Sequence, residues 1–113
     1  MPIKNITKNK IIAADFKLCE DLSKFIGLML SKNSNKTLIF KFNKEKIISL
    51  HMLFVFYPID VLFLDKNKVV VEIKERFMPF AFYTPKRKAQ YIIEIPVKTI
   101  KKTKTKLGDK ISF

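Results

Sequence analysis

Apolar positions along this chain fall into short runs and alternations, which is the pattern of β-strands. The residues involved are mostly Val, Ile, Phe and Tyr, whose side chains suit a pleated, half-buried surface. Polar clusters rich in Asn, Lys, Asp and Gly separate the runs and indicate turns. The pattern therefore predicts a mostly β protein, with strands at residues 11–14, 37–42, 69–74, 91–95 and 110–113, and turns at 43–46, 65–68 and 106–109.

The longest apolar stretch, residues 47–73, raises the question of a membrane span. Residues 47–64 are just long enough for a spanning helix of about 18 residues. However, they contain Asp60, which costs about 2.5–3.5 kcal/mol inside a span, and Pro58, which interrupts the hydrogen bonds of a helix. The stretch divides naturally at Tyr57-Pro58 into two strand-length pieces. We therefore expect buried strands here, split at Pro58 and joined by the turn at 65–68 to the strand at 69–74 in a hairpin, and no membrane span.

The remaining segments add little helix. Residues 19–29 have helical spacing, because Leu22, Phe25, Ile26 and Met29 lie on one stripe. Residues 77–87 carry two prolines and read as an extended connection, and residues 97–102 suit a single helical turn. With 113 residues there is room for one core. We expect a single domain over residues 1–113, a compact antiparallel barrel or sandwich with one or two short helices and a flexible N-terminus over residues 1–9.

The charge of the chain is strongly basic, with 23 Lys and Arg against 10 Asp and Glu. An anionic partner is one explanation. A general lysine bias that covers solvated surfaces is the other, and we favour it, since Lys outnumbers Arg 21 to 2 and phosphate-binding surfaces often use Arg. If nucleic acid binds, the basic residues beside the aromatic segment and near the C-terminus are the candidate contacts: Lys86, Arg87, Lys88, Lys101 and Lys102.

Three residues are candidates for a polar pocket: His51, Asp60 and Glu94. His51 is the one histidine, and it has no second histidine or cysteine cluster that would complete a metal site. Asp60 and Glu94 each sit between two apolar residues, so each points to the opposite side of its strand from those neighbours. If buried, each carboxyl needs hydrogen-bond donors, such as backbone amides or a lysine. Alternatively, the acids line a pocket and take part in proton transfer.

The sequence leaves three classes of function open. The first is a small binding module with an unknown ligand or protein partner. The second is a hydrolase-like or metal-assisted enzyme around His51, Asp60 and Glu94, and the third is non-specific nucleic-acid binding. Common phosphate-loop, dinucleotide, zinc-protease and serine-hydrolase motifs are missing from the sequence, and we expect no cofactor. The single cysteine and the lack of an apolar leader in the first ten residues favour the cytoplasm.

Five motifs in order resemble one known family: SKFIGLM, HMLFVFYPIDVLFLD, VVVEI, YIIEIP and KLGDKI. Together they are similar to the prokaryotic domain-of-unknown-function family 192, in which Met, Pro, Ile and Asp are spaced as Met52, Pro58, Ile59 and Asp60 are here. The resemblance covers residues 10–113. It implies a compact, mostly β fold with short helices and no established activity. His51 before Met52 departs from the commoner bacterial pattern and looks like the archaeal branch.

Overall fold

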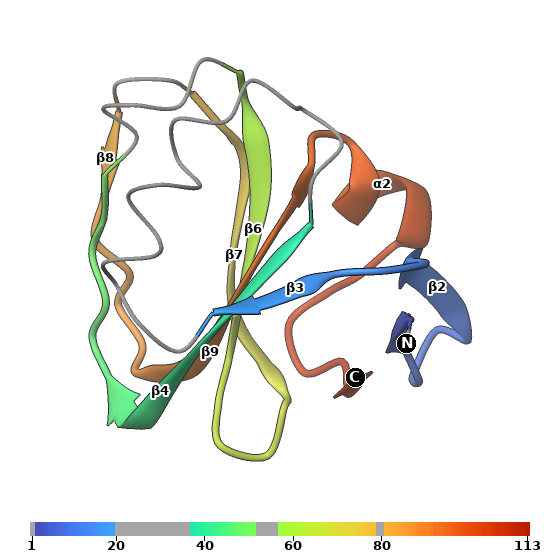
Figure 1. Ribbon diagram of the computed structural model, residues 1–113, viewed down its shortest axis with the longest axis horizontal. Helices are drawn as coiled ribbons and strands as arrows, with labels where there is room; N and C mark the ends of the chain where they lie inside the picture. The colour runs from blue at the N-terminus through green and yellow to red at the C-terminus, as the bar shows by residue number, and fades with distance from the viewer. Residues whose placement is uncertain (1, 20–36, 52–56, 79–80) are drawn as a thin grey trace.

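A computed structural model describes residues 2–19, 37–51, 57–78 and 81–113, and every structural statement below concerns these residues (Figure 1). Ten strands and one short helix lie within them. The elements are β1 (Ile3–Asn5), β2 (Lys10–Ala13), β3 (Lys17–Cys19), β4 (Leu38–Lys46), β5 (Leu50–His51), β6 (Ile59–Leu64), β7 (Val70–Phe77), β8 (Phe82–Tyr83), β9 (Ala89–Pro96), α2 (Thr99–Thr103) and β10 (Ile111–Ser112).

A five-stranded sheet in the order β3-β4-β9-β6-β7 forms the centre of the fold. Neighbouring strands are antiparallel, except that β3 runs parallel to β4. The β6–β7 hairpin turns at Asp65, whose Oδ1 accepts hydrogen bonds from the amides of Asn67 (2.8 Å) and Val69 (3.0 Å). Figure 1 shows β6, β7 and β9 running side by side through the middle of the molecule.

Smaller layers cover both faces of the central sheet. On one face the two-stranded β5–β8 sheet packs its Leu50 and Tyr83 against Val61, Phe63 and other core residues. On the other face the three-stranded β10-β1-β2 sheet and α2 enclose a second core of mainly Ile and Leu. Since β6 lies between these two cores, all six of its residues are buried. This is why the sequence from Val61 to Leu64 is continuously apolar.

Most sequence-based expectations are confirmed. The hairpin, its turn, the strand at 91–95, the helical turn after residue 97 and the final strand are all present. Gly108 supplies the positive φ of 89° that the turn at 106–109 requires. Of the two expected architectures the structure is sandwich-like, since β3 and β7 remain as the ends of an open central sheet. No helix among the described residues is long and apolar enough to cross a membrane.

Some expectations were wrong. Residues 3–5, which we expected within a flexible N-terminus, form β1, because Ile3 and Asn5 are fully buried between neighbouring strands. The turn expected at 43–46 is instead a continuation of β4, where Lys46 pairs with Ala89 of β9. The parallel β3–β4 pair departs from an all-antiparallel sheet. The helix expected at residues 19–29 lies almost entirely outside the described residues.

The expected alternation in β7 is also interrupted. A regular strand would put Val71 and Ile73 on the same face, but Val71 packs against one core and Ile73 against the other. The reason is a register shift where Phe63 pairs with Glu72 and Leu64 with Val70, which leaves Val71 as an extra residue in β7. Each such β-bulge adds a residue to one strand and reverses the faces of the residues that follow.

Candidate ligand site between strand β7 and helix α2

Asp60 lies on the sheet face that packs against α2. Its partner on β9 is Ile95, a member of the core on that face. Asp60 is 1% exposed, and its carboxylate accepts two backbone hydrogen bonds. Oδ1 accepts from the Arg76 amide (2.9 Å) and Oδ2 from the Ile100 amide (3.0 Å). Backbone amides therefore satisfy Asp60, which is one of the alternatives that the sequence left open, and one carboxylate connects β7 to α2.

Glu94 lies on the opposite face of the same sheet. It pairs with Leu38 of β4 and Val61 of β6, which both belong to the core beneath β5 and β8. Glu94 is 7% exposed, and burial raises the pKa of its carboxyl to about 8. The pKa of the nearby Tyr57 is raised by its own burial and then by the charge of Glu94. Asp60 and Glu94 thus face different environments and do not form an acid pair.

His51 belongs to the layer on the Glu94 side of the sheet. Its backbone pairs with Phe82 between β5 and β8, and its side chain lies outside the described part of the structure. Within the described ranges, no group of three or more His, Cys, Asp and Glu side chains is arranged to hold a metal ion. Of the three predicted pocket residues, Asp60 and Glu94 therefore do not meet, because they lie on opposite faces of the sheet.

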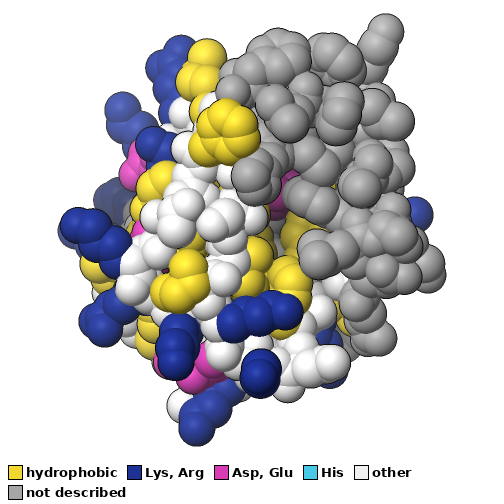
Figure 2. Space-filling model, turned by 90° about the vertical axis from the view of Figure 1, so that its left-hand side faces the viewer, with side chains coloured by type: hydrophobic (Ala, Val, Ile, Leu, Met, Phe, Trp, Pro, Cys, Tyr) yellow, Lys and Arg dark blue, Asp and Glu magenta, His cyan; other side chains and the backbone are white. Residues whose placement is uncertain are grey.

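The predicted nucleic-acid contacts separate into two groups. Lys86, Arg87 and Lys88 follow β8, where the amides of the first two donate to Oε1 of Glu72 (2.8 and 3.2 Å). Lys101 and Lys102 lie on α2, at the other side of the molecule (Figure 1). On the face that carries β5 and β8, Figure 2 shows Lys and Arg side chains dispersed among apolar and neutral surface.

A groove of about 790 Å³ lies between β7 and the segment that contains α2. Its apolar residues are Ile73 from β7, Ile100 from α2 and Leu107, which is 65% exposed. One acid, Glu75, also lines it, together with Thr105. The basic residues around it are Lys8, Lys101, Lys104 and Lys106. The groove therefore combines an apolar surface with an excess of positive charge.

A smaller pocket of about 210 Å³ adjoins the groove, and Glu75 and Lys101 line both. Its other residues are Asp60, Arg76, Val97 and Lys98. Asp60 thus lines a polar pocket as well as accepting backbone amides, whereas Glu94 is not among the residues of that pocket. Across the two cavities six basic side chains accompany two acidic ones, which makes the site electropositive.

A buried polar network holds the C-terminal wall of the groove. The fully buried Asn5 donates from Nδ2 to Thr105 Oγ1 (3.1 Å) and to Asp109 Oδ2 (2.9 Å). Asp109 also accepts from the Lys106 amide (2.9 Å) and from Lys8 Nζ (3.0 Å). Burial alone would raise the pKa of Asp109, but these hydrogen bonds and the Lys8 charge outweigh it and hold that pKa below its ordinary value. The network fixes where Thr105 and Lys106 face the groove.

Three residues around these cavities have a left-handed backbone: Arg76 (φ 52°), Lys98 (φ 76°) and Lys104 (φ 57°). This conformation costs a non-glycine residue about 1–2 kcal/mol. Lys98 and Lys104 are the residues that flank α2 at its two ends. Such backbone strain is common at binding sites, where the surrounding structure maintains it.

The family can now be stated from sequence comparison. The model of the family DUF192, described as "Uncharacterized ACR, COG1430", matches residues 7–113. This chain belongs to the DUF192 family. The resemblance seen in the sequence motifs is therefore confirmed, and the family's description names no activity.

Curated relatives of this DUF192 member carry the name UPF0127 protein and come from archaea. Those of Thermococcus sibiricus and Thermococcus kodakarensis are 41% and 42% identical, over 96% and 98% of this chain and 72% of each relative. The relative from Pyrococcus furiosus is 38% identical, over 96% of this chain and 95% of its own length. These identities place the chain beside the archaeal members, as the residues around His51 suggested.

Two crystal structures have the same fold as this DUF192 chain. One is from Sinorhizobium meliloti 1021 and is named provisionally as a transcription regulator (TM-score 0.85, 19% identity, 98% of this chain and 89% of the other). The second is a protein of unknown function from Novosphingobium aromaticivorans (TM-score 0.80, 18% identity, 100% of this chain and 84% of the other). At these identities the likeness concerns the fold alone.

Sequence reasoning missed several residues of the site. It named Lys101 as a candidate nucleic-acid contact but favoured solvated surface for the basic residues, and it did not single out Glu75, Arg76, Asn5 or Asp109 as site residues. One signal was available for Arg76, since it is one of two arginines in a chain with 21 lysines. The remaining residues meet through long-range contacts that the local pattern does not show.

Proposed function

We propose that this DUF192 member is a cytoplasmic binding domain for an amphipathic small molecule that has a carboxylate or phosphate at one end. The ligand occupies the groove between β7 and α2. The observation that carries this proposal is the pairing of an apolar groove surface with four lysines against one glutamate. The single cysteine of the chain supports the cytoplasmic location.

The size and lining of the groove support a small ligand. Its volume of about 790 Å³ falls in the range of roughly 300–1,000 Å³ typical of ligand pockets. Ile73, Ile100 and Leu107 can bury an alkyl or ring portion, and the methylene stems of the lysines extend that apolar surface. No aromatic ring lines the groove among the described residues. Single-stranded nucleic acid is therefore less well matched, because its bases stack on such rings.

The charges around the groove support an anionic end on that ligand. Lys8 already contacts Asp109, so the field at the groove comes chiefly from Lys101, Lys104 and Lys106. Each of these three is exposed. At a partly solvated site such charges attract an anion modestly and are screened by salt. We therefore expect binding that weakens as ionic strength rises.

The test is calorimetric titration with octyl phosphate below its micelle-forming concentration, beside octyl glucoside, which has the same chain and a neutral head. Octyl phosphate should bind, and octyl glucoside should bind at least about tenfold more weakly. Amide shifts in NMR spectra should map to Ile73, Ile100 and Leu107. Equal binding of both compounds, or shifts elsewhere only, would contradict the proposal.

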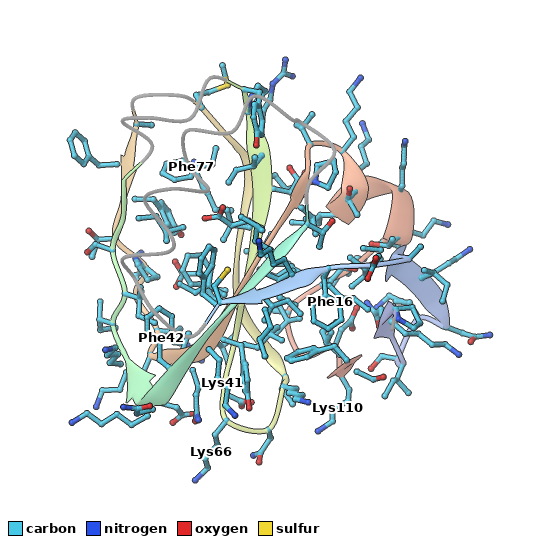
Figure 3. The ribbon with its side chains drawn as sticks, viewed as in Figure 1. Phe16, Lys41, Phe42, Lys66, Phe77 and Lys110 are labelled. Carbon is cyan, nitrogen blue, oxygen red and sulfur yellow. The ribbon has the colours of Figure 1, made fainter. Side chains whose placement is uncertain are left out.

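Matched lysine variants locate the site. Lys101→Ala with Lys104→Ala should weaken octyl phosphate binding about tenfold. The control is Lys41→Ala with Lys66→Ala, which removes the same charge from the end of the molecule away from α2 (Figure 3), and it should change binding less than about twofold. Binding of oligothymidylate, or of phosphatidylglycerol vesicles, without binding of octyl phosphate would replace this proposal with a nucleic-acid or membrane surface.

A further inference from the structure

We infer that the pocket of about 210 Å³ is an oxyanion subsite, in which Arg76 receives the carboxylate or phosphate of the ligand held in the groove. The inference rests on the proposed function and adds to it the residue that recognises the anionic end. Glu75 and Lys101 line both cavities. A single ligand can therefore place its apolar part in the groove and its charged end in the pocket.

The pocket is built by a β-bulge in β7. Ile59 pairs with Phe77 and Val61 with Lys74, so two residues of β7, Glu75 and Arg76, lie opposite Asp60. A bulge redirects side chains, and bulges are frequent next to binding sites. Both bulge residues line the pocket. The irregularity of the strand therefore coincides with the proposed subsite.

Asp60 holds the walls of the pocket at a fixed separation. One of its oxygens binds the amide of Arg76 in the bulge, and the other binds the amide of Ile100 in α2. Asp60 is 1% exposed, so both hydrogen bonds lie inside the fold. Asp60 is a positioning residue, because it fixes the backbone that carries Arg76 and the helix beside Lys98 and Lys101.

The residue type at position 76 matches an oxyanion. A guanidinium presents a planar fork of donors that fits a carboxylate or phosphate with two parallel hydrogen bonds, whereas an ammonium is a point charge. This chain uses Lys at 21 of its 23 basic positions and Arg at two. One of those two arginines stands in this pocket, with Lys98 and Lys101 beside it.

The volume of the pocket sets the size of the group that it accepts. A volume of about 210 Å³ lies below the range of roughly 300–1,000 Å³ that is typical of pockets for a whole small ligand. That space suffices for one phosphate or carboxylate with its first carbon atoms. It is too small for the whole ligand, which must extend into the groove.

The decisive experiment replaces each arginine by lysine and measures octyl phosphate and octanoate binding by calorimetry. Arg76→Lys keeps the charge and removes the fork, and should weaken binding of both compounds about tenfold. Arg87→Lys makes the same change beside β8, and should leave binding within about twofold of the wild type. Inorganic phosphate should compete with octyl phosphate in the wild type and less well in Arg76→Lys.

A second variant separates binding from folding. Arg76→Gly removes the side chain and also the left-handed strain at φ 52°, since glycine adopts that conformation freely. The melting temperature should stay equal or rise, while octyl phosphate binding falls at least about tenfold. If binding and melting temperature fall together, the effect is structural and the subsite assignment is wrong.

The outcomes distinguish the two proposals. Suppose that octyl phosphate binding depends on Lys101 and Lys104, but Arg76→Lys binds as Arg87→Lys does. The groove is then still the ligand site, and the assignment of the oxyanion subsite is wrong. If octyl phosphate does not bind the wild type at all, the proposed function itself fails and the subsite with it. Equal weakening by both arginine variants would indicate general electrostatics and would also overturn the subsite.

Discussion

Asp60 and Glu94 are two buried carboxyls on neighbouring strands of one sheet, and they have opposite environments. Asp60 faces the α2 layer and accepts two backbone amides. Glu94 faces the β5–β8 layer, and its pKa rises to about 8 because burial disfavours its charge. The comparison shows that two carboxyls buried to a similar extent on one sheet can have different surroundings. The donors to Asp60 come from the bulge in β7 and from α2.

The largest expected effect is the change in the free energy of unfolding with pH that Glu94 causes. Its carboxyl keeps a proton in the folded chain up to about pH 8 but loses it near 4.5 when unfolded. Below pH 4.5 both states are protonated, and between 4.5 and 8 the unfolded state binds fewer protons, so stability falls as pH rises. The fall is at most about 1.4 kcal/mol per pH unit.

The variant Glu94→Gln removes this titration while keeping the shape of the side chain. Urea unfolding at pH 5, 6, 7 and 8 should give a falling free energy of unfolding for the wild type and a nearly flat one for Glu94→Gln. The variant should therefore be the more stable protein at pH 8. Parallel slopes in the two proteins would show that Glu94 is charged in the fold.

Replacing Asp60 should change the free energy of unfolding in the opposite direction to replacing Glu94. Asp60→Asn leaves one acceptor for two amides, so at neutral pH one of the Arg76 and Ile100 amides loses its partner. A buried amide without an acceptor costs about 1–3 kcal/mol. Urea unfolding at pH 7 should therefore show Asp60→Asn destabilised, while Glu94→Gln is stabilised. Effects of the same sign would remove the contrast between the two faces.

The sequence predicted the orientation of each acid on its own strand, but it did not predict the contrast between the two acids. Alternation correctly placed Asp60 opposite its apolar neighbours, and the same held for Glu94. Whether the two acids share a face depends on the register between β6 and β9, where a shift of one residue would reverse the answer. Asp60 pairs with Ile95 and Val61 with Glu94, and that register is a tertiary property.

The local sequence pattern could not predict the donors to Asp60 either. They lie 16 and 40 residues further along the chain. Arg76 stands at a left-handed position that usually carries Gly or Asn, so the bulge has no turn signature in the sequence. By contrast, the β6–β7 hairpin was predictable because its apolar strands and polar turn are contiguous.

A third buried carboxyl, Asp109, extends the comparison to acid pH on the α2 side. Donors hold its pKa below the ordinary value of 3.8. Its stabilisation is therefore complete above about pH 4 and is lost as pH falls through the lowered folded value. Asp109→Asn should cost about 1–3 kcal/mol at pH 7 and should show a smaller further loss between pH 4 and 2. Chemical unfolding over that range measures both.

The smallest effect on stability is expected at Glu75, an exposed carboxyl in the same bulge as Arg76. A surface substitution such as Glu75→Gln usually changes stability by less than about 0.5 kcal/mol. The same change removes a negative charge from the walls of both the groove and the pocket, so octyl phosphate affinity should rise about two- to threefold at low salt. Octyl glucoside binding should not change.

The prediction fails if Glu75→Gln weakens octyl phosphate binding, because Glu75 would then be contributing to the site by some contact other than charge. Glu75→Gln thus tests the claim that exposed charge on this face acts on the ligand, whereas buried charge acts on the fold.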